Sequence, residues 1–238
     1  MVRVKLIAYN KPIVGDDPRR LVVLAVKVSS GKLHERDWSH YLSSYSEKDV
    51  HEHLVKASRY PVVLEHIVFT FLIEDISRVT SHQLVRHRLA TYTQESQRYS
   101  ESYIKQAFEC LRYYGAEKLE DALRLCTENL KIAVSCLERA FIIPRDMLSN
   151  DNVLRKYIEE LLRTLFKYYE LQKHGVRLED ARFIIPQAVK TRILMTVNLR
   201  ELLHIACLRL RPEAQWEIRD VVESMIREAE RIVPEIKP

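Results

Sequence analysis

The pattern of apolar and polar positions along the chain predicts strands in three segments. Residues 2–9 alternate between aliphatic and charged side chains, which is typical of a half-buried strand. The segments EHIVFTFLIED (65–75) and KTRILMTVN (190–198) are rich in β-branched and aromatic residues, which favours strands. LVVLAVKVSS (21–30) is ambiguous, because its β-branched residues favour a strand while its length allows a helix.

Amphipathic spacing predicts helices in much of the remaining chain. Ser46 is a suitable N-cap for a short helix over 46–58, and Asn198 for a helix over 198–211 that ends before Pro212. Further helices are predicted over 77–90, 103–113, 117–141, 152–173 and about 214–232, with a polar loop after residue 90. We therefore expect a single α+β domain over residues 1–238, with a mainly antiparallel central sheet packed with helices.

Composition, the N-terminal residues and the cysteines indicate in which compartment the protein is expected. The 238 residues are 47% hydrophobic, as in an ordinary globular core, and no apolar run reaches the roughly 18 residues of a membrane helix. The N-terminal residues alternate and carry charge, so they do not resemble a signal peptide, and we expect a cytoplasmic protein. The cysteines form no C-x-x-C pair and have apolar neighbours, so we expect four core thiols: Cys110, Cys126, Cys136 and Cys207.

The net charge and the glycine content limit how a ligand is bound. A net charge of +5 suits an anionic ligand or a nucleic acid. The chain has only four glycines, and it contains neither G-x-G-x-x-G nor G-x-x-x-x-G-K-[ST]. Any bound nucleotide must therefore be held by side chains.

Basic residues gather in SHQLVRHRLATYTQESQRYS (81–100). Arg86, His87, Arg88 and Arg98 lie within thirteen residues, and Glu95 is the only acid in the stretch. On a helix Arg86 and Arg88 would point about 200° apart, so donors would lie on both faces. A solvated basic helix is the alternative, but such a face normally intersperses acids at i+4.

A second group of polar residues interrupts the apolar helix predicted over 198–211. Asn198, Arg200, His204 and Arg209 lie on it, and His204 alone would be interpreted as a core histidine. Arg182 lies beside another apolar run, where an ion pair with Glu179 or Asp180 is the simpler interpretation.

These blocks together resemble the flavin-dependent thymidylate synthases. RHRLATYTQES followed by QRYS resembles the signature of that family, and LEH (64–66), ARFIIPQAVKT (181–191) and TVNLRELLHIACLRLR (196–211) resemble its other blocks in the same order. The resemblance covers most of residues 46–220. It implies a homotetramer that binds FAD and methylates dUMP to dTMP with methylenetetrahydrofolate, while NADPH reduces the flavin, for DNA precursor synthesis.

The resemblance also implies roles for individual residues, with no metal ion, nucleic acid or membrane as partner. The residues expected to bind dUMP are Gln83, Leu84, Val85, Arg86, Gln94, Glu95, Ser96, Gln97, Arg98, Arg182 and Arg209. Those expected to bind FAD are Val62, Arg86, His87, Arg88, Gln94, Asn198, Leu199, Arg200 and His204. Arg209 matches the arginine that faces the uracil, where a fixed cation favours the ionised ring, and it is the expected catalytic residue.

Two features qualify the chemistry. A serine nucleophile needs a neighbouring base, so we interpret Ser96 as a hydrogen-bonding ligand of dUMP, and no enzyme nucleophile is expected. The block SRYPVVLEH departs from the family, because Tyr60 stands at the usual His position and Val62 at the usual Ser or Thr position. A family member with impaired catalysis is therefore one alternative.

Two alternatives come from other classes of protein. A nucleic-acid-binding module would use the basic helix together with Tyr92, Tyr99 and Tyr103 for stacking. A metal-dependent nucleotide hydrolase is suggested by HEH (51–53), but the chain contains neither a His-Asp dipeptide nor H-E-x-x-H.

Overall fold

The computed structural model describes residues 2–236, which divide into two compact units. The described part of unit 1 comprises residues 2–74, 82–93 and 193–236, and unit 2 comprises residues 75–81 and 94–192. The expectation of one catalytic domain over residues 1–238 stays a prediction.

A four-stranded antiparallel sheet with the order β1-β2-β4-β3 confirms the predicted α+β fold. Its strands are β1 (Arg3–Tyr9), β2 (Val68–Ser77), β3 (Ala90–Gln94) and β4 (Lys190–Asn198). β1 pairs with β2 from Arg3 opposite Glu74 to Tyr9 opposite Phe69, with one irregularity between Leu6 and Ala8. The three strands predicted over 2–9, 65–75 and 190–198 are thus confirmed.

Strand β3 corrects the predicted loop after residue 90. Ala90, Tyr92 and Gln94 are half-buried, while Thr91 and Thr93 are exposed. This alternation has the period of a strand, and Thr and Tyr favour strands. The segment looked like a loop because most of its side chains are polar.

Seven helices, including two short 3₁₀ turns, lie wholly in the described part of unit 1. They are α1 (Arg20–Ser29), η1 (Lys32–His34), α2 (Trp38–Ser43), α3 (Glu47–Ala57), η2 (Pro61–His66), α10 (Leu199–Arg209) and α11 (Trp216–Glu230). The ambiguous segment 21–30 is helical, because Val22 and Val23 of α1 are buried, and this packing outweighs the β-branched preference. Ser46 caps α3 as predicted, and its hydroxyl accepts from the backbone N–H of Asp49.

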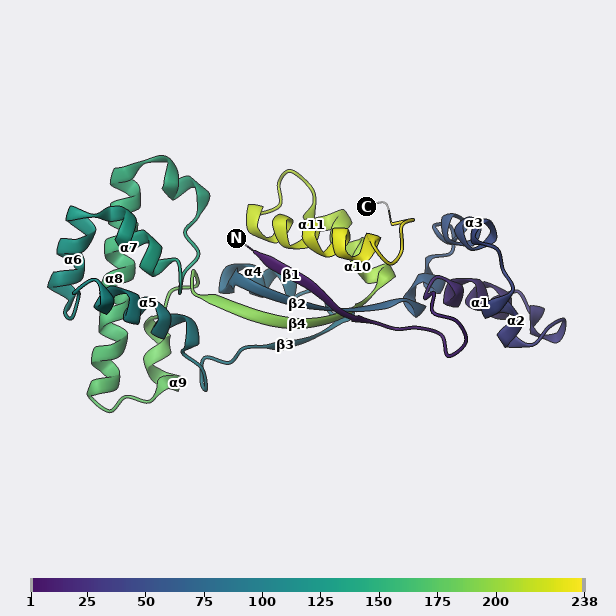
Figure 1. The fold of residues 1–238 in the computed structure, drawn as a ribbon, viewed down its shortest axis with the longest axis horizontal. Helices are drawn as coiled ribbons and strands as arrows, with labels where there is room; N and C mark the ends of the chain where they lie inside the picture. The colour runs from purple at the N-terminus through teal and green to yellow at the C-terminus, as the bar shows by residue number, and fades with distance from the viewer. Residues whose placement is uncertain (1, 237–238) are drawn as a thin grey trace. The chain divides into compact units, whose positions relative to one another are not determined.

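The core of unit 1 lies between the sheet and the last two helices. Figure 1 shows α10 and α11 on one side of the sheet, and α11 packs on β1. On β2, Phe69, Phe71 and Ile73 are fully buried, whereas the alternate positions are only half-buried. This burial of every second side chain fixes the register of β2.

Unit 2 is built from helices around their own core. Its helices are α5 (Ser102–Tyr113), α6 (Leu119–Glu128), α7 (Leu130–Leu137), η3 (Arg145–Ser149), α8 (Asp151–Lys173), α9 (Leu178–Ala181) and η4 (Arg182–Ile184). The helix predicted over 117–141 is two helices, because Asn129 ends α6 and its side chain accepts from the backbone N–H of Ile132 at the start of α7. Gly175 follows α8 with a φ of 84°, which glycine adopts at no steric cost.

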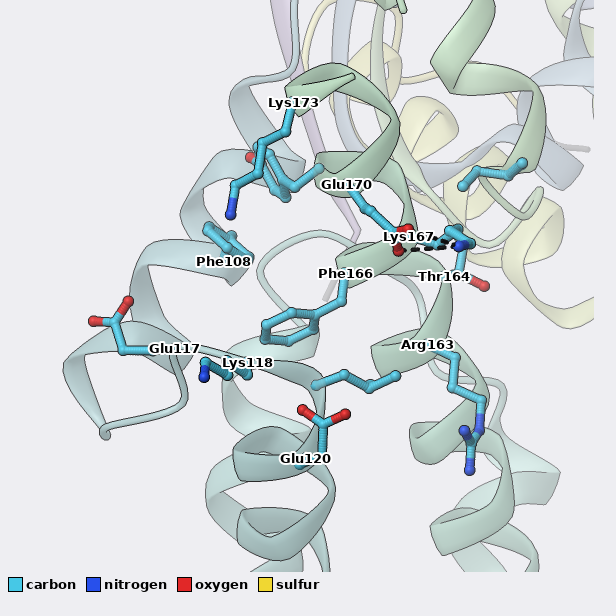
Figure 2. A pocket seen from close by; sticks show the side chains of 13 residues that line it. Phe108, Glu117, Lys118, Glu120, Arg163, Thr164, Phe166, Lys167, Glu170 and Lys173 are labelled. Carbon is cyan, nitrogen blue, oxygen red and sulfur yellow. Dashed lines mark hydrogen bonds and ion pairs between the residues drawn. The ribbon is translucent and has the colours of Figure 1, made fainter. Parts of the chain in front are cut away.

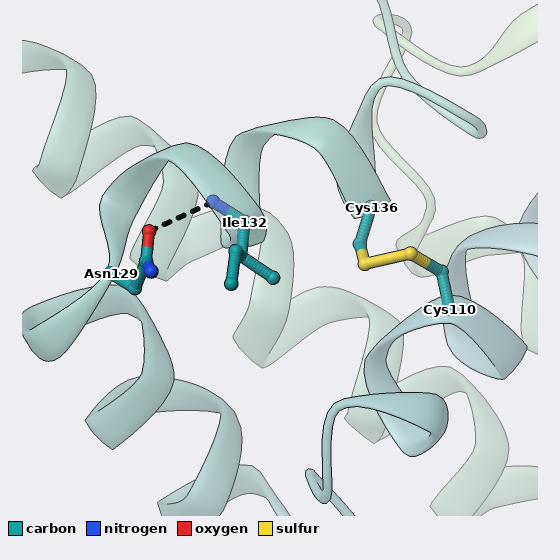
Figure 3. The surroundings of a disulfide bond; sticks show 4 residues. All are labelled: Cys110, Asn129, Ile132 and Cys136. Carbon is teal, nitrogen blue, oxygen red and sulfur yellow. Dashed lines mark hydrogen bonds between the residues drawn. A yellow bond between two sulfur atoms is a disulfide. The ribbon is translucent and has the colours of Figure 1, made fainter.

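The cysteines correct the expectation of four core thiols. Cys110 of α5 and Cys136 of α7 form a disulfide, which joins two helices of unit 2 (Figure 3). Cys126 is a buried free thiol, as expected, but Cys207 is exposed on α10. The expectation failed for the pair because sequence spacing does not show that two helices bring sulfur atoms together. Over residues 2–236, no helix is both long enough and apolar enough to span a membrane.

Candidate functional site

The Arg-His-Arg segment lies in a turn rather than on a helix. Helix α4 (Arg78–Leu84) ends before it, and residues 85–89 form turns that lead into β3, so the helix predicted over 77–90 is too long. The Tyr92 hydroxyl donates to the backbone carbonyl oxygens of Leu84 (2.8 Å) and His87 (3.0 Å). The side chain of the following strand thus fixes the shape of the turn.

Arg86 and Arg88 are the available cations of this turn. Both side chains are exposed, and neither forms an ion pair with any residue from 2 to 236. An arginine fork without an acidic partner can bind a phosphate without first losing an ion pair. The turn therefore fits an anionic ligand, as the resemblance implies.

Helix α10 begins where β4 ends, and this junction is firmly anchored. The Asn198 side chain accepts from the backbone N–H of Glu201 at 2.8 Å, which confirms the predicted cap. The backbone N–H of Leu199 donates to the carbonyl oxygen of Ile67 at 2.8 Å. Asn198 thus holds the helix with its oxygen, and its amide nitrogen remains a donor for a ligand.

Two basic residues on α10 are exposed. Arg200 binds Glu65 at 2.6 Å, and the two side chains are 50% and 41% exposed. His204 is exposed, so the interpretation as a core histidine is wrong. Both can reach a ligand, although Arg200 must exchange Glu65 for it.

Arg209 and His87 meet inside unit 1. The Nε–H of Arg209 donates to Nε2 of His87 at 3.1 Å, and its Nη2 lies 3.4 Å from the backbone oxygen of Gln83. Nδ1 of His87 lies 3.7 Å from Oε1 of Glu201, and both side chains are buried. The structure therefore brings together three predicted residues, Gln83, His87 and Arg209, with an unpredicted acid.

Burial and charge set the protonation of this cluster. Burial lowers the pKa of His87 to about 4, and the charges of Arg209 and His204 act in the same direction. Burial raises the pKa of Glu201, while the charges of His204 and Arg200 oppose that shift. His87 is therefore a neutral imidazole at pH 7.

Several predicted ligands of unit 1 present little side chain to a solute. Leu84 is fully buried and Leu199 is 2% exposed, so only their backbone atoms could reach one, whereas Val85 is partly exposed. Leu84 and Leu199 pack in the core, and the predicted ligand contacts of all three residues stay predictions.

In unit 2, Glu95 organises the segment after β3. Its Oε1 accepts from the hydroxyls of Ser100 (2.6 Å) and Ser102 (2.8 Å), and its Oε2 lies 3.2 Å from Nε of Arg192. The Gln94 side-chain nitrogen donates to the hydroxyl of Ser81 at 2.9 Å. Both predicted ligands thus already hold protein partners that shape this segment.

Arg98 and Arg182 are linked through one acidic residue. Arg98 Nη2 lies 3.1 Å from a carboxylate oxygen of Glu179. Arg182 Nε donates to the backbone oxygen of Glu179 at 3.0 Å. Arg182 does not form the ion pair with Glu179 or Asp180 that was considered from the sequence. The Arg182 charge is therefore not neutralised by this neighbour.

Arg78 joins this group, although the sequence did not point to it. It is half-buried, one of its Nη atoms donates to the backbone oxygen of Glu95 at 3.2 Å, and its Nε is buried without a hydrogen-bond partner in the described chain. Burial and the nearby charge of Arg182 lower the pKa of Arg78. Two guanidinium groups that repel each other, one with an unused buried donor, suit an anion. A single arginine at the start of a helix gives no sequence signal for this.

The potential nucleophiles of the signature have no base beside them. Ser96 Oγ accepts from the backbone N–H of Arg98 at 3.2 Å, and no histidine among residues 2–236 hydrogen-bonds to it. Gln97 contributes a buried amide nitrogen without a partner in the same part of the structure. These observations support the interpretation of Ser96 as a ligand.

Tyr60 and Val62 lie on the wall of an apolar groove. With residues of α1, among them Leu24 and Val28, they line a cavity of about 340 Å³ in unit 1. Tyr60 is 52% exposed and Val62 40% exposed. The departing block therefore presents an apolar side chain at the position where a hydroxyl was expected.

A larger cavity lies among the helices of unit 2 (Figure 2). It measures about 600 Å³, and its aromatic wall is formed by Phe108, Phe166 and Tyr169. The ring centroids of Phe166 and Tyr169 lie 5.3 and 4.1 Å from that of Phe108. Lys167 binds Glu170 at 3.0 Å beside it. No predicted FAD or dUMP ligand is among its lining residues, so we assign it no part in this site.

The alternatives gain little from the structure. Of the three tyrosines considered for base stacking, Tyr99 is exposed, but Tyr103 is buried and Tyr92 points its hydroxyl inward. Within residues 2–236 there is no group of three or more His, Cys, Asp or Glu that could hold a metal ion.

Comparison with known proteins identifies the family. A family model described as "Thymidylate synthase complementing protein" matches residues 5–235. The flavin-dependent thymidylate synthase of Pyrococcus furiosus is 39% identical over 231 residues, which cover 96% of this chain and 79% of that protein. The enzyme of the same name from Thermococcus onnurineus is 38% identical over 230 residues, which cover 95% and 78%.

Solved structures share the fold. The flavin-dependent thymidylate synthase ThyX of Helicobacter pylori, complexed with FAD and dUMP, has a TM-score of 0.65 and 19% identity, with 95% of this chain and 93% of that chain covered. The UMP/dUMP methylase PolB of Streptomyces cacaoi has a TM-score of 0.70 and 20% identity, with 98% and 91% covered. The resemblance based on the Arg-His-Arg signature is thereby confirmed, and the chain belongs to the flavin-dependent thymidylate synthases.

Proposed function

We propose that this protein catalyses the FAD-dependent reductive methylation of dUMP to dTMP, with methylenetetrahydrofolate as carbon donor and NADPH as reductant. Family membership supports the reaction, and the structure of the Helicobacter pylori relative contains FAD and dUMP. The observation that carries the proposal is the cluster of unit 1, where Arg86 and Arg88, which form no ion pair within residues 2–236, flank His87, and His87 accepts a hydrogen bond from Arg209. We further propose a cytoplasmic homotetramer.

The residues of unit 1 fit a flavin dinucleotide. Arg86 and Arg88 offer exposed forks to its phosphates, and Asn198 and His204 add donors on α10. When bound, FAD supplies the hydride that reduces the transferred carbon. Side chains bind and orient the ligands, because the sequence contains no glycine-rich loop whose backbone could do so.

Arg209 supplies the electrostatic part of the chemistry. A fixed guanidinium beside the uracil lowers the pKa of its ring N–H and makes carbon 5 more electron-rich. Since Ser96 has no base and no other activated nucleophile is visible in the described site, carbon 5 is activated without a covalent bond to the enzyme.

In unit 2, the guanidinium groups of Arg78, Arg98 and Arg182 favour a nucleotide phosphate. Arg78 has an unused buried donor, and Arg182 carries a charge that no carboxylate neutralises among residues 2–236. A dianionic phosphate would satisfy both.

The test is the release of tritium from carbon 5 of labelled dUMP, measured with FAD and NADPH, with and without methylenetetrahydrofolate. We expect dTMP formation only when all components are present. A yellow protein that binds dUMP but forms no dTMP under these conditions would instead favour the impaired family member with Tyr60 and Val62.

A further inference from the structure

Three side chains of unit 1 form a continuous series from a buried carboxylate to Arg209. The side chains of Glu201 and His87 are 7% and 6% exposed, with 3.7 Å between Oε1 and Nδ1. The other ring nitrogen, Nε2, accepts from Nε of Arg209 at 3.1 Å. Each nitrogen of His87 therefore faces one charged partner.

The contact with Arg209 determines where His87 carries its proton. An arginine Nε is only a donor, so Nε2 of the ring must be free of a proton to accept from it. A neutral imidazole then carries its proton on Nδ1, which faces the carboxylate of Glu201. A doubly protonated ring would set one N–H against another and break the contact.

Glu201 is not explained by packing alone. Its neighbours Leu202, Ile205 and Ala206 on α10 are buried and apolar, and a carboxylate placed among such residues lowers stability unless it has a partner. The side chain that faces it in the described chain is the neutral His87, with 3.7 Å between Oε1 and Nδ1, and Arg200 binds Glu65. The buried charge is therefore directed at one nitrogen of one ring.

We propose that Glu201 is a positioning residue, which through His87 holds the Arg209 guanidinium in the orientation required at the pyrimidine. The carboxylate selects the Nδ1–H form of the ring, and this form supplies the acceptor for Arg209. The acceptor and the backbone oxygen of Gln83 together hold two N–H groups of the guanidinium. The consequence for catalysis rests on the proposed function of Arg209.

The test is Glu201→Gln, studied by nitrogen-15 NMR of histidine- and arginine-labelled protein and by steady-state kinetics. A glutamine amide can donate to Nδ1, which favours the opposite ring form and sets N–H against Arg209. We expect the His87 signals to change form, the Arg209 Nε–H signal to shift, and kcat for dTMP to fall at least tenfold. FAD affinity should stay within about threefold.

Two variants provide controls. Glu217→Gln removes another buried carboxylate of unit 1, on α11, and should leave the His87 and Arg209 signals unchanged. His87→Gln places an amide oxygen near the position of Nε2, so Arg209 keeps an acceptor that does not depend on Glu201. In that background, Glu201→Gln should lower kcat by less than twofold.

The wild-type protein gives a test without substitution. Burial and the charges of Arg209 and His204 lower the pKa of His87 to about 4, so acidification to that pH protonates the ring. The Arg209 Nε–H signal should shift as His87 becomes protonated. Glu201, whose pKa is raised by burial, also loses its charge on acidification. An Arg209 signal that does not follow His87 would overturn the proposal, as would an unchanged ring form in Glu201→Gln. A changed ring form with unchanged kcat would also overturn the proposal, because the orientation of Arg209 would then not be required, while Arg209→Ala tests the proposed function of Arg209 separately.

Discussion

Arg86 and Arg88 of unit 1 lie in different electrostatic surroundings from Arg98 of unit 2. In unit 1, Arg86 and Arg88 are exposed and form no ion pair within residues 2–236. In unit 2, Arg98 binds Glu179, and Arg192 lies 3.2 Å from Glu95. A guanidinium without an ion pair contributes the whole free energy of its interaction with the ligand to binding. A paired guanidinium must first give up its carboxylate, so its net contribution to affinity is smaller. A count of basic residues in a sequence therefore overstates the number of available anion ligands.

The largest effect is expected for Arg209→Ala in unit 1. Loss of a positioned charge at the reacting ring typically lowers kcat by about a hundred- to a thousandfold. We expect dTMP formation to fall by this order, while NADPH still reduces the flavin, and stopped-flow absorbance separates the two steps. Arg211→Ala, nearby on the chain and exposed, is the matched control. Methylation at near wild-type rates would assign the polarising role to another group.

Removal of the disulfide of unit 2 should change stability rather than ligand binding. Cys110 and Cys136 are 26 residues apart, and closing a loop of that size contributes roughly 3–4 kcal/mol to the free energy of unfolding. Cys110→Ala with Cys136→Ala should lower stability by about that amount in denaturant titrations, with FAD affinity unchanged. Equal stability of the oxidised and reduced wild-type protein would contradict this expectation.

The free arginines of unit 1 should contribute directly to FAD affinity. Arg88→Ala removes a hydrogen bond to a charged phosphate, which is worth roughly 1.5–3 kcal/mol, or about ten- to a hundredfold in Kd. Arg200→Ala should cost less, because Arg200 gives up Glu65 when it binds FAD. Arg36→Ala, another exposed arginine of unit 1, controls for net charge. Wild-type affinity of both Arg88→Ala and Arg200→Ala by fluorescence quenching would remove FAD from this cluster.

The paired arginine of unit 2 permits the opposite experiment. Glu179→Gln frees Arg98 from an exposed ion pair worth about 0–1 kcal/mol, so dUMP should bind up to about fivefold more tightly. Calorimetric titration measures this change, and Glu170→Gln, which frees Lys167 outside the predicted site, is the control. Weaker dUMP binding would mean that Glu179 orients Arg98 rather than competing for it.

The sequence predicted the parts of the fold that have a regular pattern. Alternation located β1, β-branched and aromatic residues located β2 and β4, and the caps Ser46 and Asn198 located the starts of α3 and α10. The pattern gave wrong predictions where tertiary packing determines the secondary structure. The turn that carries His87 was predicted as helix, and strand β3 was predicted as a loop.

The site followed the same division. The signature pointed to His87 and the later block 196–211 to Arg209, and the structure joins them by a hydrogen bond. Glu201 and Arg78 gave no sequence signal, because their roles depend on partners that are distant in sequence or on burial. The disulfide was missed for the same reason, since only the fold brings its two helices together.

A further effect on FAD affinity is expected from the departing block of unit 1. Val62 lies on the wall of an apolar groove beside α1, and the family usually has a hydroxyl at its position. A hydrogen bond to a phosphate at a half-exposed site adds about 1.5 kcal/mol, so Val62→Ser should tighten FAD by about tenfold if the hydroxyl is simply missing. Val62→Ala controls for the smaller side chain.

A substitution at Tyr60 distinguishes a missing hydroxyl from a hydroxyl that Tyr60 supplies instead. Its side chain is 52% exposed beside Val62, and its hydroxyl can donate to a phosphate in place of the missing one. In that case Tyr60→Phe weakens FAD or dUMP binding, and Val62→Ser changes little. A third outcome also has a clear meaning: if neither substitution changes either affinity, this block does not contact FAD or dUMP, and the alignment of SRYPVVLEH with the family block is wrong.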